Sequence, residues 1–508
     1  MKQYQTVELS FIGEAPKGSY AIVDMTATLC HGDSVQHLNG FYDGDGVYKL
    51  RFLPEEAGVY TYKISGCINA EGTVEVEPAD CNYHGIVRAD GTRFVYSDGT
   101  PYHAFGTTVY ALAHQEEALI DQTIDTLSKS PFNKVRMCTF PKFYDFNHNE
   151  PTYYPFEKDA EGNWDVHRPS IPFWHAFERR INQMNSLGIE VDLILFHPYD
   201  KWGFATMTLE QDLVYLDYLL RRLAALPNMW WSLANEYDLT PKDMEHWYAI
   251  EDFVAEKDPY HHLLSNHNCF KFWDFSRKNV THGCAQTKML HKANAWLQQY
   301  GKPIMIDECC YEGNIPHNWG SISAEEMTSR FWKATVVGAY CTHGETYLDD
   351  NDVLWWAKGG ILKGESPARI AFLRQIIESL PGHLEGEFTF MEKMAAVPED
   401  KRLEVEFDSP GQKDFVEALW RLGDEIVPFM ESEILNFCGH IGDEYYLKYY
   451  DTRTCAKDTL ELPADKAYTV ELIDTWNMTR KTILTNVSGK VEIDLPGKIY
   501  TAVLVSKE

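Results

Sequence analysis

The chain has 508 residues, more than one hydrophobic core usually holds, so we expect roughly two to four domains. A formal net charge of −30 argues against nucleic acid and against an anionic membrane surface as partners. No apolar run reaches membrane-spanning length, and residues 1–8 lack the apolar region of a secretory signal, so we expect a cytoplasmic protein. The 11 cysteines show no C-x-x-C spacing, which favours reduced thiols over disulfides or a zinc site.

Residues 1–80 consist of short runs in which apolar and polar residues alternate. Turn-forming pairs such as Asn39-Gly40 separate the runs, and this combination is typical of a small β-sandwich. Two further turns, Asp90-Gly91 and Asp98-Gly99, predict a hairpin that closes the floor of the next domain. The alternating runs are Val7–Phe11, Val47–Phe52, Val59–Ile64 and Thr73–Val76.

Strands and helices alternate between residues 84 and 381. Eight βα units in about 280 residues match the size of a (β/α)8 TIM barrel. The gap between the fifth and sixth strands is short, so we expect a vestigial helix there, and residues 145–168 are predicted to form a long loop. The eight predicted strands are Tyr102–Thr107, Lys134–Phe140, Glu190–His197, Met229–Glu236, His262–His267, Val280–Gln286, Pro303–Glu308 and Val337–Glu345.

Residues 382–508 return to short strands separated by Pro and Gly, and a second β-sandwich without a chemical motif is expected there. The sequence therefore predicts an α/β protein, a (β/α)8 TIM barrel flanked by an N-terminal and a C-terminal β-sandwich. The predicted strands of the last part are Glu444–Tyr449, Tyr468–Ile473, Lys490–Asp494 and Tyr500–Val505.

Two of the predicted barrel strands end in glutamate. The fourth ends in Asn235-Glu236 and the seventh in Asp307-Glu308, and barrel enzymes place their chemistry at these carboxyl ends. Hydrolysis of a glycoside with retention needs two carboxyl groups about 5–5.5 Å apart, one as acid and one as nucleophile. Two neighbouring carboxylates also raise one another's pKa, which separates their roles. Since side chains alternate along a strand, we expect only one of Asp307 and Glu308 to face the barrel axis.

These motifs, in this order, resemble the clan of retaining glycosidases with (β/α)8 barrels that contains cellulases, mannanases and β-galactosidases, and are similar to its family five. The resemblance implies that Glu236 is the acid/base, that Glu308 is the nucleophile, and that Asn235 donates to the 2-hydroxyl of the sugar. The stretch 39–58 resembles the immunoglobulin-like domain that often precedes such barrels in bacteria.

The same resemblance implies further substrate-binding residues. Arg136, at the end of strand two, would orient and ionise the nucleophile, His197 ends strand three, and Trp355 or Trp356 would floor the −1 subsite. The clan's aromatic residue on strand six is missing here, so His282 or Gln286 would replace it. His267 and His343 also lie at strand ends, and for His267, His282 and His343 a purely structural hydrogen-bonding role stays open.

The expected activity is hydrolysis of a β-linked glycoside or oligosaccharide with net retention, with no metal and no organic cofactor. Two other functions stay open. A metal-dependent barrel hydrolase would require a His-x-His motif on strand one, where Tyr102–Gly106 contains a single histidine. A non-catalytic carbohydrate-binding barrel would have lost turnover, against which both carboxylates argue. The sequence leaves the sugar, the linkage, exo or endo action, transglycosylation and the oligomeric state undetermined.

Overall fold

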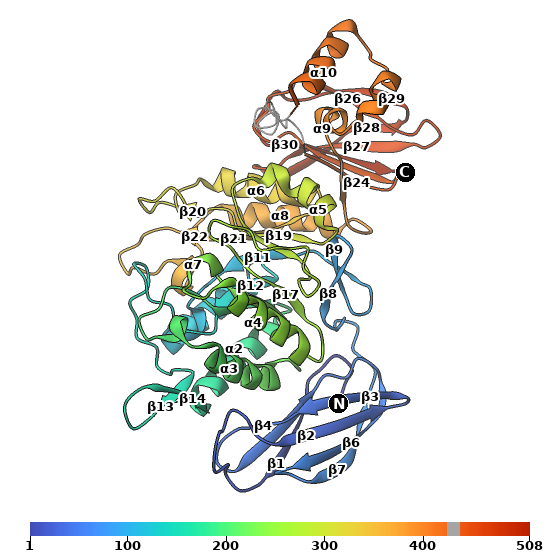
Figure 1. Cartoon of the computed structure of the whole chain (residues 1–508). Helices are drawn as coiled ribbons and strands as arrows, with labels where there is room; N and C mark the ends of the chain where they lie inside the picture. Colours follow the sequence, from blue (N-terminus) through green and yellow to red (C-terminus); the bar gives the residue numbers. More distant parts are fainter. Residues whose placement is uncertain (424–436) are drawn as a thin grey trace.

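The computed structural model describes residues 1–423 and 437–508. The chain forms three parts in sequence order: N-terminal antiparallel sheets, a central barrel surrounded by helices, and C-terminal antiparallel sheets (Figure 1). This arrangement confirms the predicted fold class. None of the described helices is both long and apolar enough to span a bilayer.

Two antiparallel sheets make up the N-terminal part. Alternate residues of β5, namely Tyr48, Leu50 and Phe52, are buried between the sheets, as period-two patterning requires. The predicted sandwich is thereby observed, with β2, β3 and β4 added to the predicted strands. One sheet has the order β3(Ser34–Asn39), β2(Met25–His31), β6(Gly58–Gly66), β7(Ala70–Val76), and the other β1(Val7–Ile12), β5(Val47–Phe52), β4(Phe41–Tyr42).

Eight parallel strands form the central barrel, in the order β17-β16-β15-β12-β11-β21-β19-β18. The edges β17 and β18 meet through the backbone, where Thr281 N donates to Leu264 O at 2.9 Å. Every residue of β15 is buried, because one face of the strand lies inside the barrel and the other lies under helices. The strands are β11(Phe105–Thr108), β12(Lys134–Cys138), β15(Glu190–Phe196), β16(Met229–Ala234), β17(Leu263–Ser265), β18(Gly283–Gln286), β19(Ile304–Glu308) and β21(Tyr340–His343).

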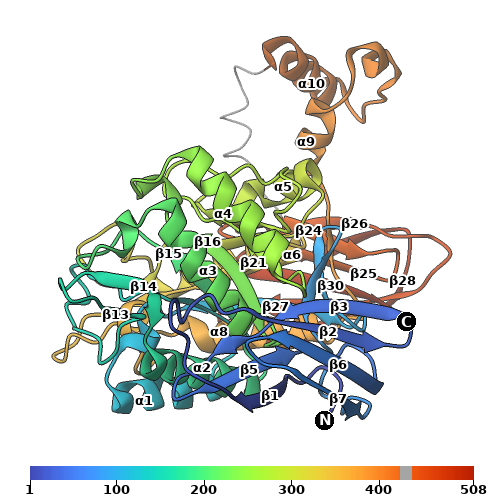
Figure 2. The same cartoon turned by 60° about the horizontal axis from the view of Figure 1, so that its bottom comes forward.

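Helices cover the outside of the barrel (Figures 1 and 2). No helix joins β17 to β18, where the short gap predicted a vestigial one. The predicted long loop 145–168 instead contains a short hairpin, β13(Phe156–Lys158) and β14(Trp164–Pro169). The main helices are α1(Glu117–Ser128), α2(Ile171–Ser186), α3(Leu209–Leu223), α4(Met244–Lys257), α5(Ala293–Tyr300), α6(Ala324–Val336) and α8(Ser366–Glu378), with short α7(Trp355–Lys358) before α8.

A small antiparallel sheet closes the amino end of the barrel, where the two Asp-Gly turns predicted a hairpin. It consists of β8(Val87–Asp90), β9(Arg93–Tyr96) and β10(Pro101–Tyr102). The Phe94 ring lies 5.0 Å from the Trp230 ring and 4.8 Å from the Tyr340 ring, between centroids. Packed aromatic rings therefore close the amino end of the barrel.

The C-terminal part contains a six-stranded sheet and a two-stranded one. All four predicted strands are present, but two helices between β23 and β24 were not predicted, α9(Phe390–Ala395) and α10(Pro410–Leu422), which project from the body in Figure 2. Residues 424–436 of the predicted sandwich lie outside the described residues. The sheets are β23(Glu385–Gly386), β24(Phe437–Ile441), β25(Tyr445–Tyr449), β30(Thr501–Lys507), β27(Tyr468–Asp474), β28(Thr479–Val487), and β26(Lys457–Glu461) with β29(Lys490–Asp494).

Buried ion pairs join the N-terminal sheets to the barrel. Arg222 of α3 lies 2.7 Å from Asp43 Oδ1 and 2.7 Å from Glu178 Oε1, and Arg51 of β5 lies 2.9 Å from Glu178 Oε1. Arg222 is fully buried. Charges removed from water at this interface stabilise it only while they stay paired.

We predict that Arg222→Met lowers the free energy of unfolding by about 3–5 kcal/mol, because Asp43 and Glu178 lose a partner in a buried setting. Urea denaturation checks this value. The matched control is Lys129→Met, whose pair with Asp125 is exposed and is expected to contribute about 1 kcal/mol or less. Equal destabilisation by both variants would contradict the role of the interface.

Candidate active site

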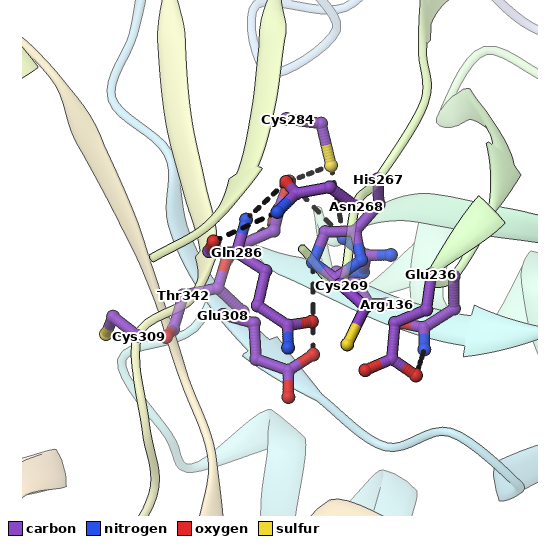
Figure 3. Close-up of polar contacts among 12 residues, drawn as sticks. Arg136, Glu236, His267, Asn268, Cys269, Cys284, Gln286, Glu308, Cys309 and Thr342 are labelled. Atoms are coloured by element: carbon purple, nitrogen blue, oxygen red, sulfur yellow. Dashed lines mark hydrogen bonds and ion pairs between the residues drawn. The ribbon is translucent and has the colours of Figure 1, made fainter. Parts of the chain in front are cut away.

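Glu236 and Glu308 lie at the carboxyl end of the barrel, each about 6% exposed. Strand β16 ends at Ala234, and the backbone then turns into the left-handed region at Glu236, with φ of 55°. A non-glycine residue in this region costs about 1–3 kcal/mol, a strain that is often found at functional sites. Glu308 is the last residue of β19, and both side chains appear in Figure 3.

Asp307 and Glu308 both point inward, contrary to the expected alternation. Ile306 pairs with Ala285 and Glu308 pairs with Gln286, so Asp307 is an extra residue in β19. Such a bulge leaves two consecutive side chains on the same side of the strand. Asp307 therefore lies inside the barrel, while Glu308 points to its mouth.

Tyr110 and Asn235 lie between the two glutamates, and the single hydrogen of the Tyr110 hydroxyl bonds either Glu308 or Asn235 at one time. The Tyr110 hydroxyl lies 2.9 Å from Glu308 Oε2 and 2.9 Å from Asn235 Oδ1. Asn235 Nδ2 donates in turn to Glu236 Oε2 at 3.1 Å, and the Tyr199 hydroxyl donates to the same oxygen. Asn235, expected to contact the sugar, thus lies next to Glu236 and between the two carboxylates.

Further donors surround Glu308. Trp319 Nε1 donates to Oε1 at 2.8 Å. With the Gln286 amide oriented to satisfy both of its atoms, its nitrogen donates to Oε2 at 3.1 Å. His267 Nε2 is 3.9 Å from Oε2 (Figure 3). The structure therefore places Gln286 and His267 at the site, as expected.

The two carboxyl groups interact electrostatically. Burial, and then the nearby charge of Glu236, raise the pKa of Glu308 to about 7. Burial also raises the pKa of Tyr110 well above 10 and lowers the pKa of His267 well below 6.5, so both of these groups are neutral near pH 7. The carboxyl pair thus retains a proton close to neutral pH.

Arg136 does not contact Glu308, which corrects the expected role of ionising the nucleophile. It lies deeper in the barrel, where Nη1 is 3.5 Å from Asp307 Oδ2 and Nε is 3.8 Å from Asp192 Oδ2. Lys134 is 2.5 Å from Asp307 and 2.7 Å from Asp192. Two cations and two anions therefore fill the barrel interior beneath the glutamates.

Two of the strand-end histidines lie away from the site. His282 lies at the amino end of β18, where its ring packs against Phe94 of the floor sheet, at 5.6 Å between centroids. His343 alternates with the inward Thr342, faces the outer layer, and bonds Thr107 Oγ1 at 3.1 Å. Both have structural roles, so the expected sugar contacts of His282 and His343 are wrong.

His197 is buried close to the site without contacting either glutamate. Its Nε2 donates to Phe140 O at 3.1 Å, and burial lowers its pKa to about 3, which keeps the ring neutral. Trp355 and Trp356 are neighbours on the short helix α7, and their rings lie in different surroundings. Trp355 lies in the core, where Nε1 donates to Thr107 Oγ1 at 2.9 Å, so it cannot floor a subsite. Trp356 packs beside Tyr311 at 5.3 Å, next to the glutamates.

Glu312, His343 and Glu345 are the only group of metal-ligating side chains close enough to share an ion among residues 1–423 and 437–508. Backbone amides already bind the carboxylates: Lys363 and Gly364 donate to Glu345, both at 2.7 Å, and Glu365 donates to Glu312 at 2.8 Å. The group therefore anchors the segment that precedes α8, away from Glu236.

Sequence patterns missed several residues of the site. Tyr199, Tyr311 and Trp319 follow strands three and seven in loops, where aromatic residues are common and carry no motif. Lys142 follows strand two and is only 2% exposed, although a loop lysine is usually solvated. In the sequence, these residues are marked only by their short distance from Arg136, His197 and Glu308.

The barrel and the carboxylate pair at its carboxyl end define a class, the glycoside-hydrolase-like (β/α)8 barrels. Residues 88–381 match the family described as apiosidase-like, catalytic domain. This match spans more than half of the chain, so the chain belongs to the apiosidase-like family. Residues 1–66 and 436–506 match two domains of unknown function, DUF5060 and DUF5605.

Solved structures agree with this assignment. A candidate glycoside hydrolase from Bacteroides vulgatus ATCC 8482 is 34% identical, with 100% of this chain and 99% of that chain covered and a TM-score of 0.85. A glycoside hydrolase of family 5 from the same organism is 13% identical and shares the fold, with 83% and 94% covered and a TM-score of 0.60. A comparison with curated proteins gave no match.

We predict that Glu236→Gln lowers the pKa of Glu308 by about 1 unit or more, because a neighbouring like charge is removed. Titration of ¹³C-labelled glutamate carboxyls by NMR measures this pKa, and Glu308→Gln identifies the signal. The control is Glu190→Gln at the amino end of β15, which should leave the pKa of Glu308 unchanged. Burial raises the pKa of Glu190 to about 8, so glutamine replaces a side chain that is already protonated near pH 7. An unchanged Glu308 pKa in Glu236→Gln would contradict the coupling.

Proposed function

We propose that the chain is a retaining β-glycosidase with Glu308 as nucleophile and Glu236 as acid/base. The observation that carries this proposal is the pair of buried carboxyl groups at the barrel mouth, with Tyr110 bonded to Glu308 at 2.9 Å and Asn235 bonded to Glu236 at 3.1 Å. Similarity to glycoside hydrolase barrels supports the reaction class. The rival metal-dependent hydrolase has no comparable group at this position among the described residues.

The donors around the pair favour a negative charge on Glu308. Trp319 Nε1, the Gln286 amide and Tyr110 can all donate to its oxygens, and hydrogen bonds to a carboxylate favour its charged form. In the proposed reaction Glu308 is therefore the carboxylate, and Glu236 supplies the proton to the leaving group. This division gives one nucleophile and one acid, as retaining hydrolysis requires.

The reaction proceeds in two steps. In the first, a Glu308 oxygen attacks the anomeric carbon while Glu236 gives its proton to the departing glycosidic oxygen, so the aglycone leaves as an alcohol. Glu308 is now a neutral ester, and Glu236 is a carboxylate without an anionic neighbour at position 308. In the second step Glu236 takes a proton from water, the water oxygen attacks the anomeric carbon, and Glu308 is released as a carboxylate.

The side chains next to the pair suggest how the glycone is held. Asn235 Nδ2 is the closest amide donor to Glu236, which suits a contact with the 2-hydroxyl group of the sugar. Trp356 with Tyr311 offers an aromatic wall beside Glu308, suited to the C–H face of a sugar ring. Because the family is described as apiosidase-like, we include a β-D-apioside among the candidate substrates.

Aryl β-glycosides, α-L-arabinosides and a β-D-apioside form the test panel. We predict that one member is hydrolysed and that Glu236→Gln lowers kcat/KM about 10²–10⁴-fold, the usual contribution of an acid/base. Glu308→Gln is expected to lower kcat about 10⁴-fold or more. NMR of the first product should show the same anomer as the substrate.

Glu190→Gln serves as the control, because it changes a buried glutamate at the opposite end of the barrel and should retain activity. Full turnover by Glu308→Gln, or an inverted product, would overturn the proposed mechanism. Specific binding of an oligosaccharide without turnover would favour a carbohydrate-binding barrel instead.

A further inference from the structure

Lys142 lies among three tyrosine rings at the barrel mouth. Its ammonium nitrogen is 3.5 Å from the ring centroid of Tyr110, 4.3 Å from that of Tyr199 and 4.6 Å from that of Tyr144. The side chain is 2% exposed, and no ion pair or hydrogen bond of Nζ is found within residues 1–423 and 437–508. Aromatic faces therefore replace the water and the counter-ion that a buried ammonium normally requires.

Two of these three tyrosines are bonded to the glutamates. The Tyr110 hydroxyl lies 2.9 Å from Glu308 Oε2, and the Tyr199 hydroxyl donates to Glu236 Oε2. A cation over the face of a phenol withdraws electron density from the ring, which makes the hydroxyl a stronger donor. One ammonium thus acts on both carboxyl groups, each through a different tyrosine.

We propose that Lys142 is a positioning residue that acts on the carboxyl pair through Tyr110 and Tyr199 and favours the ionised form of Glu308 in the resting enzyme. It touches neither glutamate within ion-pair distance, so it acts through the rings and through its electric field. The role rests on the function proposed above, because it concerns the same two glutamates.

Other groups around the pair do not change charge between about pH 5 and pH 9. Burial keeps the pKa of Tyr110, Tyr144, Tyr199 and Tyr311 far above 10, and raises that of Cys138 to about 12. Burial lowers the pKa of His197 to about 3 and that of His267 well below 6.5, while Arg136 stays charged. Cys269 is uncharged as well, because burial raises its pKa to about 12. Burial also raises the pKa of Cys310 to about 11. Burial lowers the pKa of Lys142 from its usual value, against the charges of Glu236 and Glu308, which raise it.

The sign of the expected effect follows from these charges. The Lys142 ammonium is among the influences that lower the pKa of Glu308, against burial and the charge of Glu236, which raise it to about 7. Replacing Lys142 with a neutral side chain removes this influence, so Glu308 binds its proton at higher pH. The fraction of enzyme with an ionised nucleophile then falls at neutral pH.

The first test is the carboxyl ¹³C titration of Glu308 in Lys142→Met, which needs no substrate. We expect its apparent pKa to rise by about 1 unit, with Lys142→Arg staying within about 0.3 unit of the parent because the charge is retained. Thermal unfolding of both variants verifies that each is folded. An unchanged Glu308 pKa in folded Lys142→Met would overturn the proposal.

The second test is the pH dependence of kcat/KM on the active aryl glycoside. The acid limb should move to higher pH by the same amount in Lys142→Met and return in Lys142→Arg, whereas a purely structural defect would lower the whole profile without moving it. Lys142→Met with an unmoved acid limb refutes only this inference. Full activity of Glu308→Gln refutes the proposed function, whatever Lys142 does.

Discussion

Asp307 and Glu308 are adjacent in β19, yet both face the inside of the barrel because the strand carries an extra residue opposite β18. Asp307 forms ion pairs with Lys134 and Arg136 in the barrel interior. Glu308 lies at the barrel mouth, where Tyr110 and Trp319 donate hydrogen bonds to it. Without the bulge one acidic side chain would point into the apolar outer layer, where Ile306 and Cys309 lie. The interior charge network and the site thus depend on the same irregularity.

The charges are arranged in two layers. Lys134, Arg136, Asp192 and Asp307 neutralise one another below, so they leave little net charge to act on the site. Above them, two carboxyl groups and Lys142 share the barrel mouth with neutral tyrosines. The ion pairs of the lower layer join strands β12, β15 and β19 to one another. Removing one of these four side chains would leave an unpaired buried charge and lower the free energy of unfolding by about 3–5 kcal/mol.

The sequence predicted the barrel because eight buried strands at regular intervals leave few other topologies, and it predicted Glu236, Glu308, Gln286 and His267 as neighbours because strand ends meet at one edge. The strand-end rule failed for His343, whose side chain alternates outward, and for His282, which precedes its strand. It failed for Trp355 because this residue lies on helix α7 with its ring in the core. It failed for Arg136 because Asp307, not Glu308, is its partner. No sequence motif marked Lys142 and Tyr199, because only the fold brings their loops together. The helices α9 and α10 were not predicted, because residues 382–508 were expected to form only β-strands.

We propose that Glu308 forms a covalent bond to the sugar. This bond is tested most directly by the mass of the protein after reaction with a slow 2-deoxy-2-fluoro glycoside that carries the hydrolysed glycone. We predict that the mass increases by one glycosyl unit, that the label lies on the peptide that contains Glu308, and that Glu308→Gln is not labelled. A label on Glu236 or Asp307, or undiminished labelling of Glu308→Gln, would contradict it.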